Sequence, residues 1–310
     1  MSIRGNKNLI SIVQLGTVDY ATGLALQRQL VALRKEEKIG DVLLLLEHSP
    51  VITLGRNAKA ANVVASPEFL KQRGVELFEC DRGGDVTFHG PGQIVGYPIF
   101  DLRGFAAADG KRKTLGVIEF VRRLEDVLMR SCANFGIPTK RVPGLTGVWT
   151  ENAHVDTAAS AVPRREASGD VTAADEPTAG LRPAGADEGV RPYTSKGVPP
   201  YTAEAKLAAI GVHISRFVTS HGFALNVNTD LSYFDLIVPC GITTKPVTSM
   251  QKELGRALDL NTVAESISRN VGVVFQSQML WLETLDALLG RTVGVPMQTP
   301  SEFSPPSRRR

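Results

Sequence analysis

The sequence predicts an α+β fold in which helices pack on a mixed or antiparallel sheet. Short apolar runs with the alternation of strands occur beside longer segments whose apolar residues recur at helical spacing. A turn pattern around Arg216, between two strand-like runs, indicates a hairpin and therefore antiparallel neighbours. The chain has 310 residues, 43% hydrophobic and 22% charged, which is the composition of an ordinary globular protein.

The N-terminal half of the chain supplies most of the expected elements. Strands are expected over residues 9–15, 41–47, 75–80 and 93–102, and helices over residues 20–37, 67–73 and 116–135. The short helix has suitable start signals, because Ser66 can cap its N-terminus and Pro67 fits its first position. Gly136 and Pro138 stop the last of these helices.

From residue 151 to about residue 204 the composition changes. Ala, Pro, Gly, Asp, Glu and Arg dominate, and Ile, Phe, Met and Trp are absent. Such a segment buries too little apolar surface to offset the entropy of ordering it. We therefore expect residues 151–203 to be a disordered insertion within a single domain that spans residues 1–295. Residues 296–310 are expected to form a flexible tail.

Apolar periodicity returns at Lys206. One strand is expected from Lys206 to Ile214 and the next over residues 218–228, joined by the turn at Arg216. A single long helix is expected over residues 261–289, with Asn261 as its N-cap.

Several classes of protein are excluded by composition. No apolar run approaches the roughly 20 residues that span a bilayer, and the N-terminus lacks the apolar region of a secretion signal. The cysteines Cys80, Cys132 and Cys240 show no metal spacing and cannot all pair, which fits a reducing, cytoplasmic compartment. A net charge of +3 is too small to indicate nucleic-acid binding.

The segment from Arg82 to Gln93 is the densest unusual stretch. Four glycines and a proline in these twelve residues give a backbone that can approach a ligand closely, with polar side chains along it. The order of residues matches neither a P-loop nor a dinucleotide-binding fingerprint. The segment alone is compatible with a binding site or with an irregular turn.

Cys240 lies between Pro239 and Gly241 in an otherwise apolar stretch. A lone cysteine in such a setting is commonly an inert buried thiol. Pro239, however, fixes the approach to the sulfur, and Gly241 could leave its backbone N–H free to face a developing oxyanion. Cys80 and Cys132 lack this setting and are expected in the core.

Lys206 begins a strand on the face that it shares with Ala208, Ile210 and Val212. A lysine in this position can extend to water, or it can turn inward and accept a proton from a nearby thiol. The histidines at positions 48, 89 and 221 compete for the same role, whereas those at 154 and 213 are weaker candidates. Spacing alone does not decide between a Cys–His and a Cys–Lys pair.

Taken together, these segments resemble the lipoyl(octanoyl) transferase family. The matching blocks, in order, are residues 47–56, 82–93, 97–102, 147–149, 206–211, 221–227 and 237–242. The resemblance runs from about residue 8 to residue 290. Residues 151–203 depart from it, because relatives are expected to have a shorter connection there.

The resemblance implies a fold like the catalytic domains of biotin and lipoate protein ligases. It implies an octanoyl transferase that takes its acyl group from acyl carrier protein, forms a thioester on Cys240 and acylates a lysine. Lys206 matches the lysine that takes the thiol proton. Acceptors would be the lipoyl domains of 2-oxoacid dehydrogenases and the glycine cleavage H protein. No ATP, metal or other cofactor, no nucleic acid and no membrane is implied.

The resemblance also assigns an acyl-binding surface. The matching positions are Arg82, Gly83, Gly84, Asp85, Val86, Thr87, Phe88, His89, Ala209, Ile210, Gly211, Gly222, Phe223 and Ala224. Two alternatives stay open. One is an ATP-dependent lipoate or biotin ligase, in which Cys240 would have no nucleophilic task. The other is a non-catalytic acyl-binding paralogue.

Overall fold

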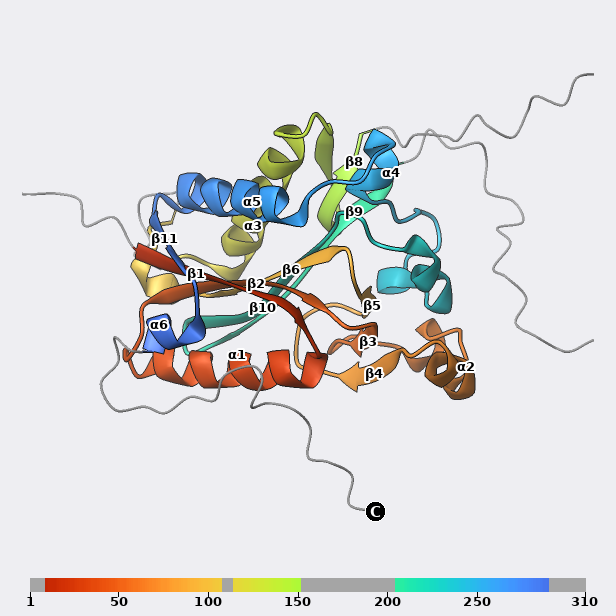
Figure 1. Ribbon diagram of the computed structural model, residues 1–310, viewed down its shortest axis with the longest axis horizontal. Helices are drawn as coiled ribbons and strands as arrows, with labels where there is room; N and C mark the ends of the chain where they lie inside the picture. Colours follow the sequence, from red (N-terminus) through yellow and green to blue (C-terminus); the bar gives the residue numbers. More distant parts are fainter. Residues whose placement is uncertain (1–8, 108–113, 152–203, 290–310) are drawn as a thin grey trace, which may run out of the picture.

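The computed structural model describes residues 9–107, 114–151 and 204–289 (Figure 1). The expected insertion and tail lie almost entirely outside these residues, as does His154. Within the described ranges the main sheet has eight strands, in the order β11-β1-β2-β6-β10-β9-β8-β7. Its strands are β1 (Leu9–Val18), β2 (Asp41–His48), β6 (Gln93–Ile99), β7 (Thr139–Val142), β8 (Leu145–Thr150), β9 (Lys206–Ser215), β10 (Val218–Asn226) and β11 (Gln278–Leu282).

The predicted mixed sheet is confirmed. Strand β1 runs parallel to β2 and to β11, whereas every pairing from β2 onward to β7 is antiparallel. A second sheet of three strands lies beside it, in the order β4-β3-β5, with β3 (Val51–Leu54), β4 (Glu76–Glu79) and β5 (Val86–His89). The helices are α1 (Tyr20–Lys35), α2 (Pro67–Gln72), α3 (Val117–Ala133), α4 (Met250–Leu254), α5 (Leu260–Phe275) and α6 (Leu285–Leu289).

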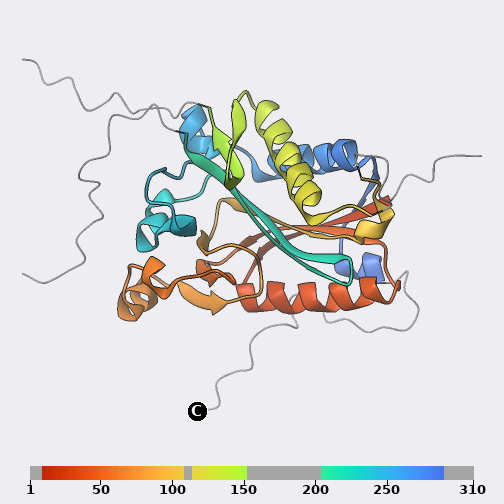
Figure 2. The same cartoon turned by 180° about the vertical axis from the view of Figure 1, so that it is seen from behind.

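Helices cover both faces of the main sheet. Helices α3 and α5 lie on one face and α1 lies on the other, as the two opposite views in Figures 1 and 2 show. Strand β2 separates the two cores: Leu43 and Leu45 face α3 and α5, while Leu44 and Leu46 face α1. The uninterrupted apolar run of β2 follows from this burial on both faces.

The hairpin predicted at Arg216 is confirmed. Ser215 of β9 pairs with Val218 of β10, and the two residues between them have positive φ angles, 48° at Arg216 and 69° at Phe217. Two successive left-handed residues make the tight turn whose twist matches that of paired strands. The hairpin therefore holds β9 and β10 in fixed register beside the site described below.

The long C-terminal helix expected over residues 261–289 is wrong. Helix α5 ends at Phe275, because Gln276 adopts a left-handed conformation with φ 53°. Residues 278–282 then form β11 against the edge of β1. The N-cap is Asp259, whose carboxylate accepts a hydrogen bond from the Thr262 backbone N–H at 2.8 Å, and not Asn261. The parallel partner of β11 lies more than 260 residues away in sequence, so helical periodicity could not reveal it.

The glycine-rich segment is also less irregular than expected. Its middle forms β5, which pairs antiparallel with β3. Alternation along β5 directs Val86 and Phe88 into a small apolar core, where each is at most 1% exposed. Thr87 and His89 face the opposite side, because successive strand residues point to opposite faces.

Candidate active site

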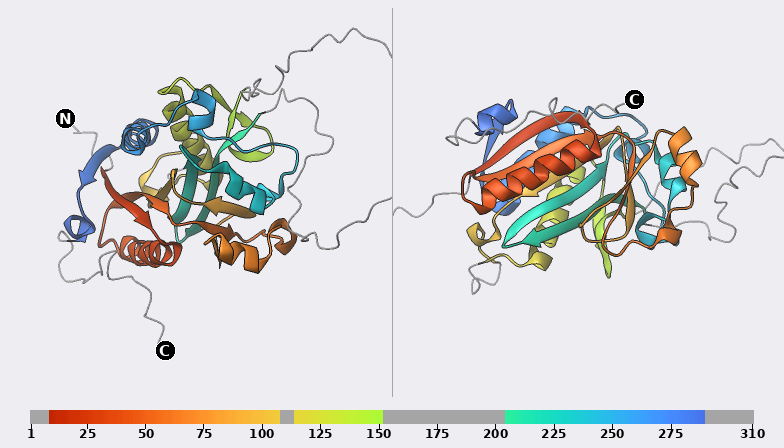
Figure 3. Two further views of the ribbon diagram at one scale, coloured as in Figure 1. Left: turned by 45° about the vertical axis from the view of Figure 1, so that its right-hand side comes forward. Right: turned by 90° about the horizontal axis from the view of Figure 1, so that it is seen from below.

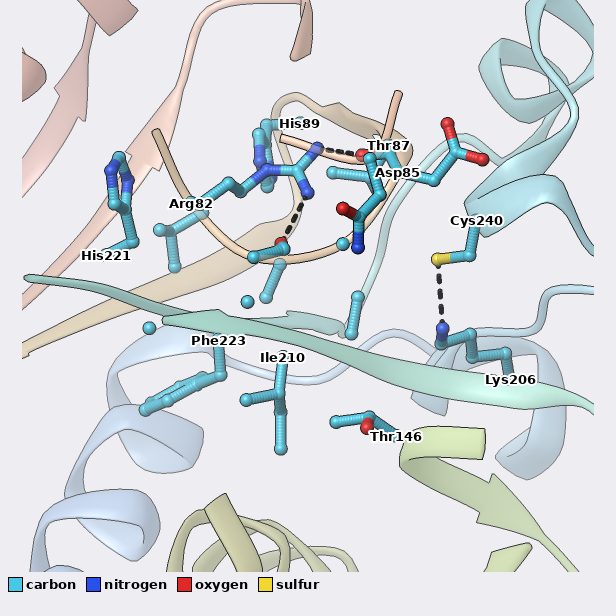
Figure 4. Close-up of a pocket in the computed structure, with 18 of the residues that line it drawn as sticks. Arg82, Asp85, Thr87, His89, Thr146, Lys206, Ile210, His221, Phe223 and Cys240 are labelled. Atoms are coloured by element: carbon cyan, nitrogen blue, oxygen red, sulfur yellow. Dashed lines mark hydrogen bonds between the residues drawn. The ribbon is translucent and has the colours of Figure 1, made fainter. Parts of the chain in front are cut away.

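A cavity of about 330 Å³ lies between the loop at Arg82 and strands β9 and β10. Figure 4 shows Cys240 and Lys206 at one end of this cavity and His221 at the other. The cavity is lined by these sequence-predicted residues: Arg82, Gly83, Gly84, Asp85, Thr87, His89, Lys206, Ala209, Ile210, Gly211, Gly222, Phe223, Ala224 and Cys240. Val86 and Phe88 do not line it, because β5 turns both side chains into the core.

The floor of the cavity consists of small residues on two paired strands. Ala209 of β9 lies opposite Ala224 of β10, and Gly211 lies opposite Gly222. A side chain at Gly211 would meet the Gly83 carbonyl oxygen, 2.6 Å from its Cβ position. Ile210 and Phe223 belong to the lining as well, but their side chains point to the other face, where Phe223 packs in the core and Ile210 packs against it. Figure 4 shows both pointing away from the Arg82 loop. The alternation of the strands thus leaves a shallow apolar trough.

The Arg82 side chain holds the loop above this trough. Its guanidinium donates to the Thr53 backbone carbonyl at 2.7 Å and to the Asp85 carbonyl at 2.6 Å. Gly55 makes room for this arrangement, since a Cβ there would lie 2.8 Å from the guanidinium and 2.4 Å from the Gly84 carbonyl oxygen. Arg82 is 8% exposed, and its guanidinium donates to oxygens of the protein itself. Arg82 therefore shapes the cavity wall.

Cys240 occupies a tight turn with a strained backbone. Residues Pro239–Gly241 form a short 3₁₀ turn, in which Cys240 has φ 55°. This left-handed conformation is costly for a residue with a side chain and occurs mostly at turns and functional sites. The Gly241 N–H donates to the Val238 carbonyl at 3.0 Å. The expectation that this N–H is free for an oxyanion is therefore wrong.

A contact that the sequence did not reveal braces the turn. Asn62 accepts a hydrogen bond from the Val238 N–H at 2.7 Å through its backbone carbonyl. Its side-chain amide donates to the Asp85 carboxylate at 2.6 Å. Asp85 in turn lies so close to Gly241 that a Cβ there would be 2.8 Å from a carboxylate oxygen. No local signal marks Asn62, because its role depends on three segments that meet only in the fold.

The Lys206 amine lies 3.0 Å from the Cys240 sulfur (Figure 4). Lys206 is 7% exposed, so its side chain turns inward instead of extending to water. The register between β8 and β9 shifts at Trp149, and the Lys206 amine lies 5.2 Å from the centre of the Trp149 ring. A cation over an indole face is stabilised by the ring quadrupole. Gly147 leaves space for the lysine stem, because a Cβ there would lie 3.1 Å from Lys206 Cε.

The competing histidines are engaged elsewhere. His48 donates from Nδ1 to the Val18 carbonyl at 2.7 Å, and its Nε2 accepts from the Tyr97 hydroxyl at 2.6 Å. His89 donates from Nδ1 to the Gln93 side-chain oxygen at 2.7 Å. Burial lowers the pKa of His48 to about 4 and that of His89 to about 3. Both imidazoles are therefore neutral at physiological pH.

The third histidine, His221, is held at the far end of the cavity. Its Nε2 donates to the Asp81 carboxylate at 2.7 Å. Burial lowers its pKa, and Asp81 partly opposes this effect.

Further lining residues that the sequence did not single out are Tyr20, Asn57, Val95, Tyr97, Gly144, Leu145, Thr146 and Ile242.

Neither a metal-binding cluster nor a membrane-spanning helix occurs in the part of the chain that the structure describes. No cluster there has three or more His, Cys, Asp or Glu side chains arranged to hold a metal ion. No helix among those residues has the length and apolar character to cross a bilayer.

The chain is similar to known proteins over most of its length. The family model of the lipoyl protein ligase A/B catalytic domain matches residues 19–272. An octanoyltransferase of Koribacter versatilis is 54% identical over 292 residues, which is 94% of each chain. An octanoyltransferase of Acidobacterium capsulatum is 49% identical over 283 residues, 91% of this chain and 96% of the relative. The Koribacter relative has nearly the same length as this chain, since the alignment covers the same share of both. The shorter connection expected in relatives at residues 151–203 therefore does not distinguish the two chains.

Solved structures support the fold. A structure from an archaeal lipoylation system, a bipartite lipoate protein ligase and its E2 lipoyl domain from Thermoplasma acidophilum, has a TM-score of 0.55 at 13% identity, covering 88% of this chain and 85% of that one. A lipoate-protein ligase A bound with ATP has a TM-score of 0.54 at 11% identity, covering 89% and 88%. At such low identity these likenesses establish the architecture alone.

Proposed function

Because this chain belongs to the lipoyl(octanoyl) transferase family, an acyltransferase family of protein lipoylation, we propose that it works through an acyl thioester on Cys240. The donor is octanoyl-acyl carrier protein, and the acceptor is a lysine of a lipoyl domain, including those of 2-oxoacid dehydrogenases and the glycine cleavage H protein. The observation that carries the proposal is the 3.0 Å approach of the Lys206 amine to the Cys240 sulfur at one end of an apolar trough.

The first half-reaction loads the enzyme. Lys206 accepts the proton of the Cys240 thiol, and the thiolate attacks the carbonyl carbon of the carrier thioester. The carrier sulfur leaves and takes its proton from the Lys206 ammonium. One thioester replaces another, so the free-energy change of this step is close to zero. Cys240 then holds the octanoyl group, whose chain lies along the small residues of β9 and β10.

The second half-reaction transfers the octanoyl group from Cys240 to the acceptor lysine. The amine of the acceptor lysine attacks the carbonyl carbon of the acyl-cysteine, and Lys206 accepts the proton that this amine loses. The Cys240 sulfur leaves and regains a proton from Lys206. The product is an amide, which is more stable than the thioester, so the second step drives the overall transfer. Neither half-reaction needs ATP or a metal ion.

The three cysteines are free thiols, which fits work in the reducing cytoplasm.

The test is the mass of the protein after incubation with octanoyl-acyl carrier protein. We expect one added octanoyl group that hydroxylamine removes, and we expect Cys240→Ala to lack it. Cys80→Ala is the matched control, since Cys80 is also partly exposed but does not line the cavity. An octanoyl adduct that persists in Cys240→Ala would refute the thioester. If acylation of a lipoyl domain required ATP, the chain would be a ligase.

A further inference from the structure

A second hollow adjoins the catalytic cavity at its far end. It is a groove of about 430 Å³ between helix α1 and the β9–β10 hairpin. Figure 3 shows this helix and this hairpin side by side when the molecule is seen from below. Within the described residues, His221 is the one side chain that lines both the cavity and the groove. It therefore lies at the boundary between the two.

His221 is fixed firmly at this boundary. Its side chain is 4% exposed, and Nε2 donates to Asp81, which lines the groove but not the cavity. Its backbone N–H donates to the Gln27 side-chain oxygen of α1 at 2.8 Å. The imidazole thus extends from β10 to the Asp81 segment, and the backbone is tied to the helix opposite.

The backbone of His221 is unusual as well. Its φ is 55°, in the left-handed region, although it lies inside strand β10. A non-glycine residue keeps such a conformation only when its surroundings hold it there. Glycine would adopt this backbone without strain, yet a histidine occupies the position. The side chain at this position therefore has a use that glycine would not supply.

The groove beyond His221 could receive an apolar chain. Leu24, Val31 and Ala32 of α1 line it beside a larger number of charged and polar residues, among them Arg28, Lys35 and Asp81, so a hydrocarbon that passed the imidazole would meet these three apolar side chains within a polar rim. Cys240 lies at the opposite end of the cavity, so the tail of an acyl group on Cys240 that follows the trough runs toward His221 (Figure 4).

We propose that His221 closes the far end of the acyl trough and sets the longest acyl chain that the site accepts. This inference rests on the proposed acyl-cysteine, and it assigns a specificity-determining residue for that reaction. With the imidazole in place, a chain longer than octanoyl meets the ring and its Asp81 tether. Without the ring, the trough continues into the groove along α1.

The experiment compares donors of increasing chain length. The parent and His221→Gly are loaded with octanoyl, dodecanoyl and tetradecanoyl carrier protein, and the rate of adduct formation is followed by intact mass. Glycine suits the left-handed backbone, so His221→Gly removes the ring without adding strain. We expect the rate for tetradecanoyl relative to octanoyl to rise about 10-fold or more in the variant, the order of discrimination that pocket size supplies. His221→Asn, whose shorter side chain also tolerates a positive φ, should give a smaller rise.

The matched control is His213→Ala. His213 lies 3.7 Å from the same Asp81 carboxylate and lines the groove, but it does not line the cavity. Its removal widens the groove without opening the boundary, so the chain-length profile should stay that of the parent. If His213→Ala broadened the profile as much as His221→Gly, the closure would not reside in His221.

Failure of the inference and failure of the proposed function give different results. If His221→Gly forms the octanoyl adduct and its chain-length profile equals that of the parent, His221 does not set the limit. If the parent forms no octanoyl adduct, the proposed function fails. Binding of free octanoic and tetradecanoic acid, measured by thermal shift, then still tests the closure: the variant alone should gain affinity for the longer acid, and equal binding by parent and variant would overturn it.

Discussion

The amine of Lys206 and the sulfur of Cys240 lie 3.0 Å apart, although 34 residues separate them in the chain. Lys206 reaches this position from the first residue of β9, where its backbone N–H donates to the Pro246 carbonyl at 2.8 Å and its carbonyl accepts from the Thr248 N–H at 2.9 Å. Cys240 reaches it from a left-handed turn braced by Asn62. Two separate segments thus fix the amine and the thiol.

Lys206→Ala should slow alkylation of Cys240 by iodoacetamide near neutral pH. In the proposed mechanism the lysine amine, which is in contact with the sulfur, accepts the thiol proton, and the thiolate is the reactive form. The difference between variant and parent should shrink above about pH 8.5, where an ordinary thiol ionises unaided.

Lys245→Ala is the control for this change. Lys245 also lies over the Trp149 ring, at 5.9 Å, but it pairs with Glu204. Cys240 in this variant should be alkylated at the same rate as in the parent. Equal alkylation of Lys206→Ala and the parent from pH 6.5 to 9 would remove Lys206 from the proposed mechanism.

Gly147→Ala should impair acylation more than its effect on stability explains. A Cβ at Gly147 would lie 2.5 Å from the Ala208 carbonyl oxygen and 3.1 Å from Lys206 Cε, so the lysine must shift. The comparison is Gly136→Ala, which has a positive φ of 80° but open space around it. Gly136→Ala should lose about 1–2 kcal/mol from the left-handed backbone. Gly147→Ala should lose more, because its Cβ also meets the Ala208 backbone carbonyl.

The two variants should differ in the rate at which the acyl-enzyme forms. The acyl-enzyme of Gly147→Ala should form at least about 10-fold more slowly, as a shift of about 1 Å in a catalytic group can cost far more. Gly136→Ala should keep the rate of the parent. Matching rates for the two variants, measured by intact mass at a temperature where both are folded, would contradict a positioning role for Gly147.

Residues 151–203 should be replaceable by a short glycine-containing turn. The Thr150 N–H donates to the Ala205 carbonyl at 2.9 Å, so the two ends of the segment are adjacent in the sheet. Loop-closure entropy grows only with the logarithm of length, so the shortened chain should be as stable as the parent or slightly more stable.

The readouts for the shortened chain are its urea midpoint and its rate of acyl-enzyme formation. We expect both to remain near the parent values. A chain that folds but no longer forms the acyl-enzyme would mean that this segment belongs to the active site. The expectation of one domain interrupted by an insertion would then need revision.

Stability should fall as pH decreases from about 6.5. The buried imidazoles of His48 and His89 have pKa values lowered to about 4 and about 3. Below the ordinary value of about 6.5 the unfolded chain binds protons that the native protein excludes. The contribution of these two histidines to the free energy of unfolding is therefore fully present above this pH. Below it, each histidine lowers the free energy of unfolding by up to about 1.4 kcal/mol per pH unit.

Urea unfolding between pH 7.5 and pH 5.5 checks this prediction, in a window where carboxylates are ionised in the unfolded chain. His48→Gln should reduce the pH slope by about half a proton averaged over this window, and by nearly one proton at its acid end, whatever its effect on absolute stability. A slope that is unchanged in this variant would show that His48 is not the buried neutral group.

The failed expectations share one cause. The helix over residues 261–289 is interrupted because β1 offers an open edge on which residues 278–282 can pair. The Gly241 N–H is bonded because the turn at Cys240 folds back on Val238. Val86 and Phe88 leave the site because β5 pairs with β3 and alternates. In each case a partner distant in sequence or a turn without a local signal decided the outcome.

The sequence by itself determined the α+β class, the hairpin at Arg216 and the family, because strand alternation, turn residues and ordered motifs are local properties. It also named both Cys240 and Lys206, but its spacing left a histidine equally able to serve the thiol. Only the tertiary structure placed the lysine against the sulfur and gave His48, His89 and His221 other partners. It alone set His221 between two hollows, because contact between segments distant in sequence depends on how the sheet and helix α1 pack.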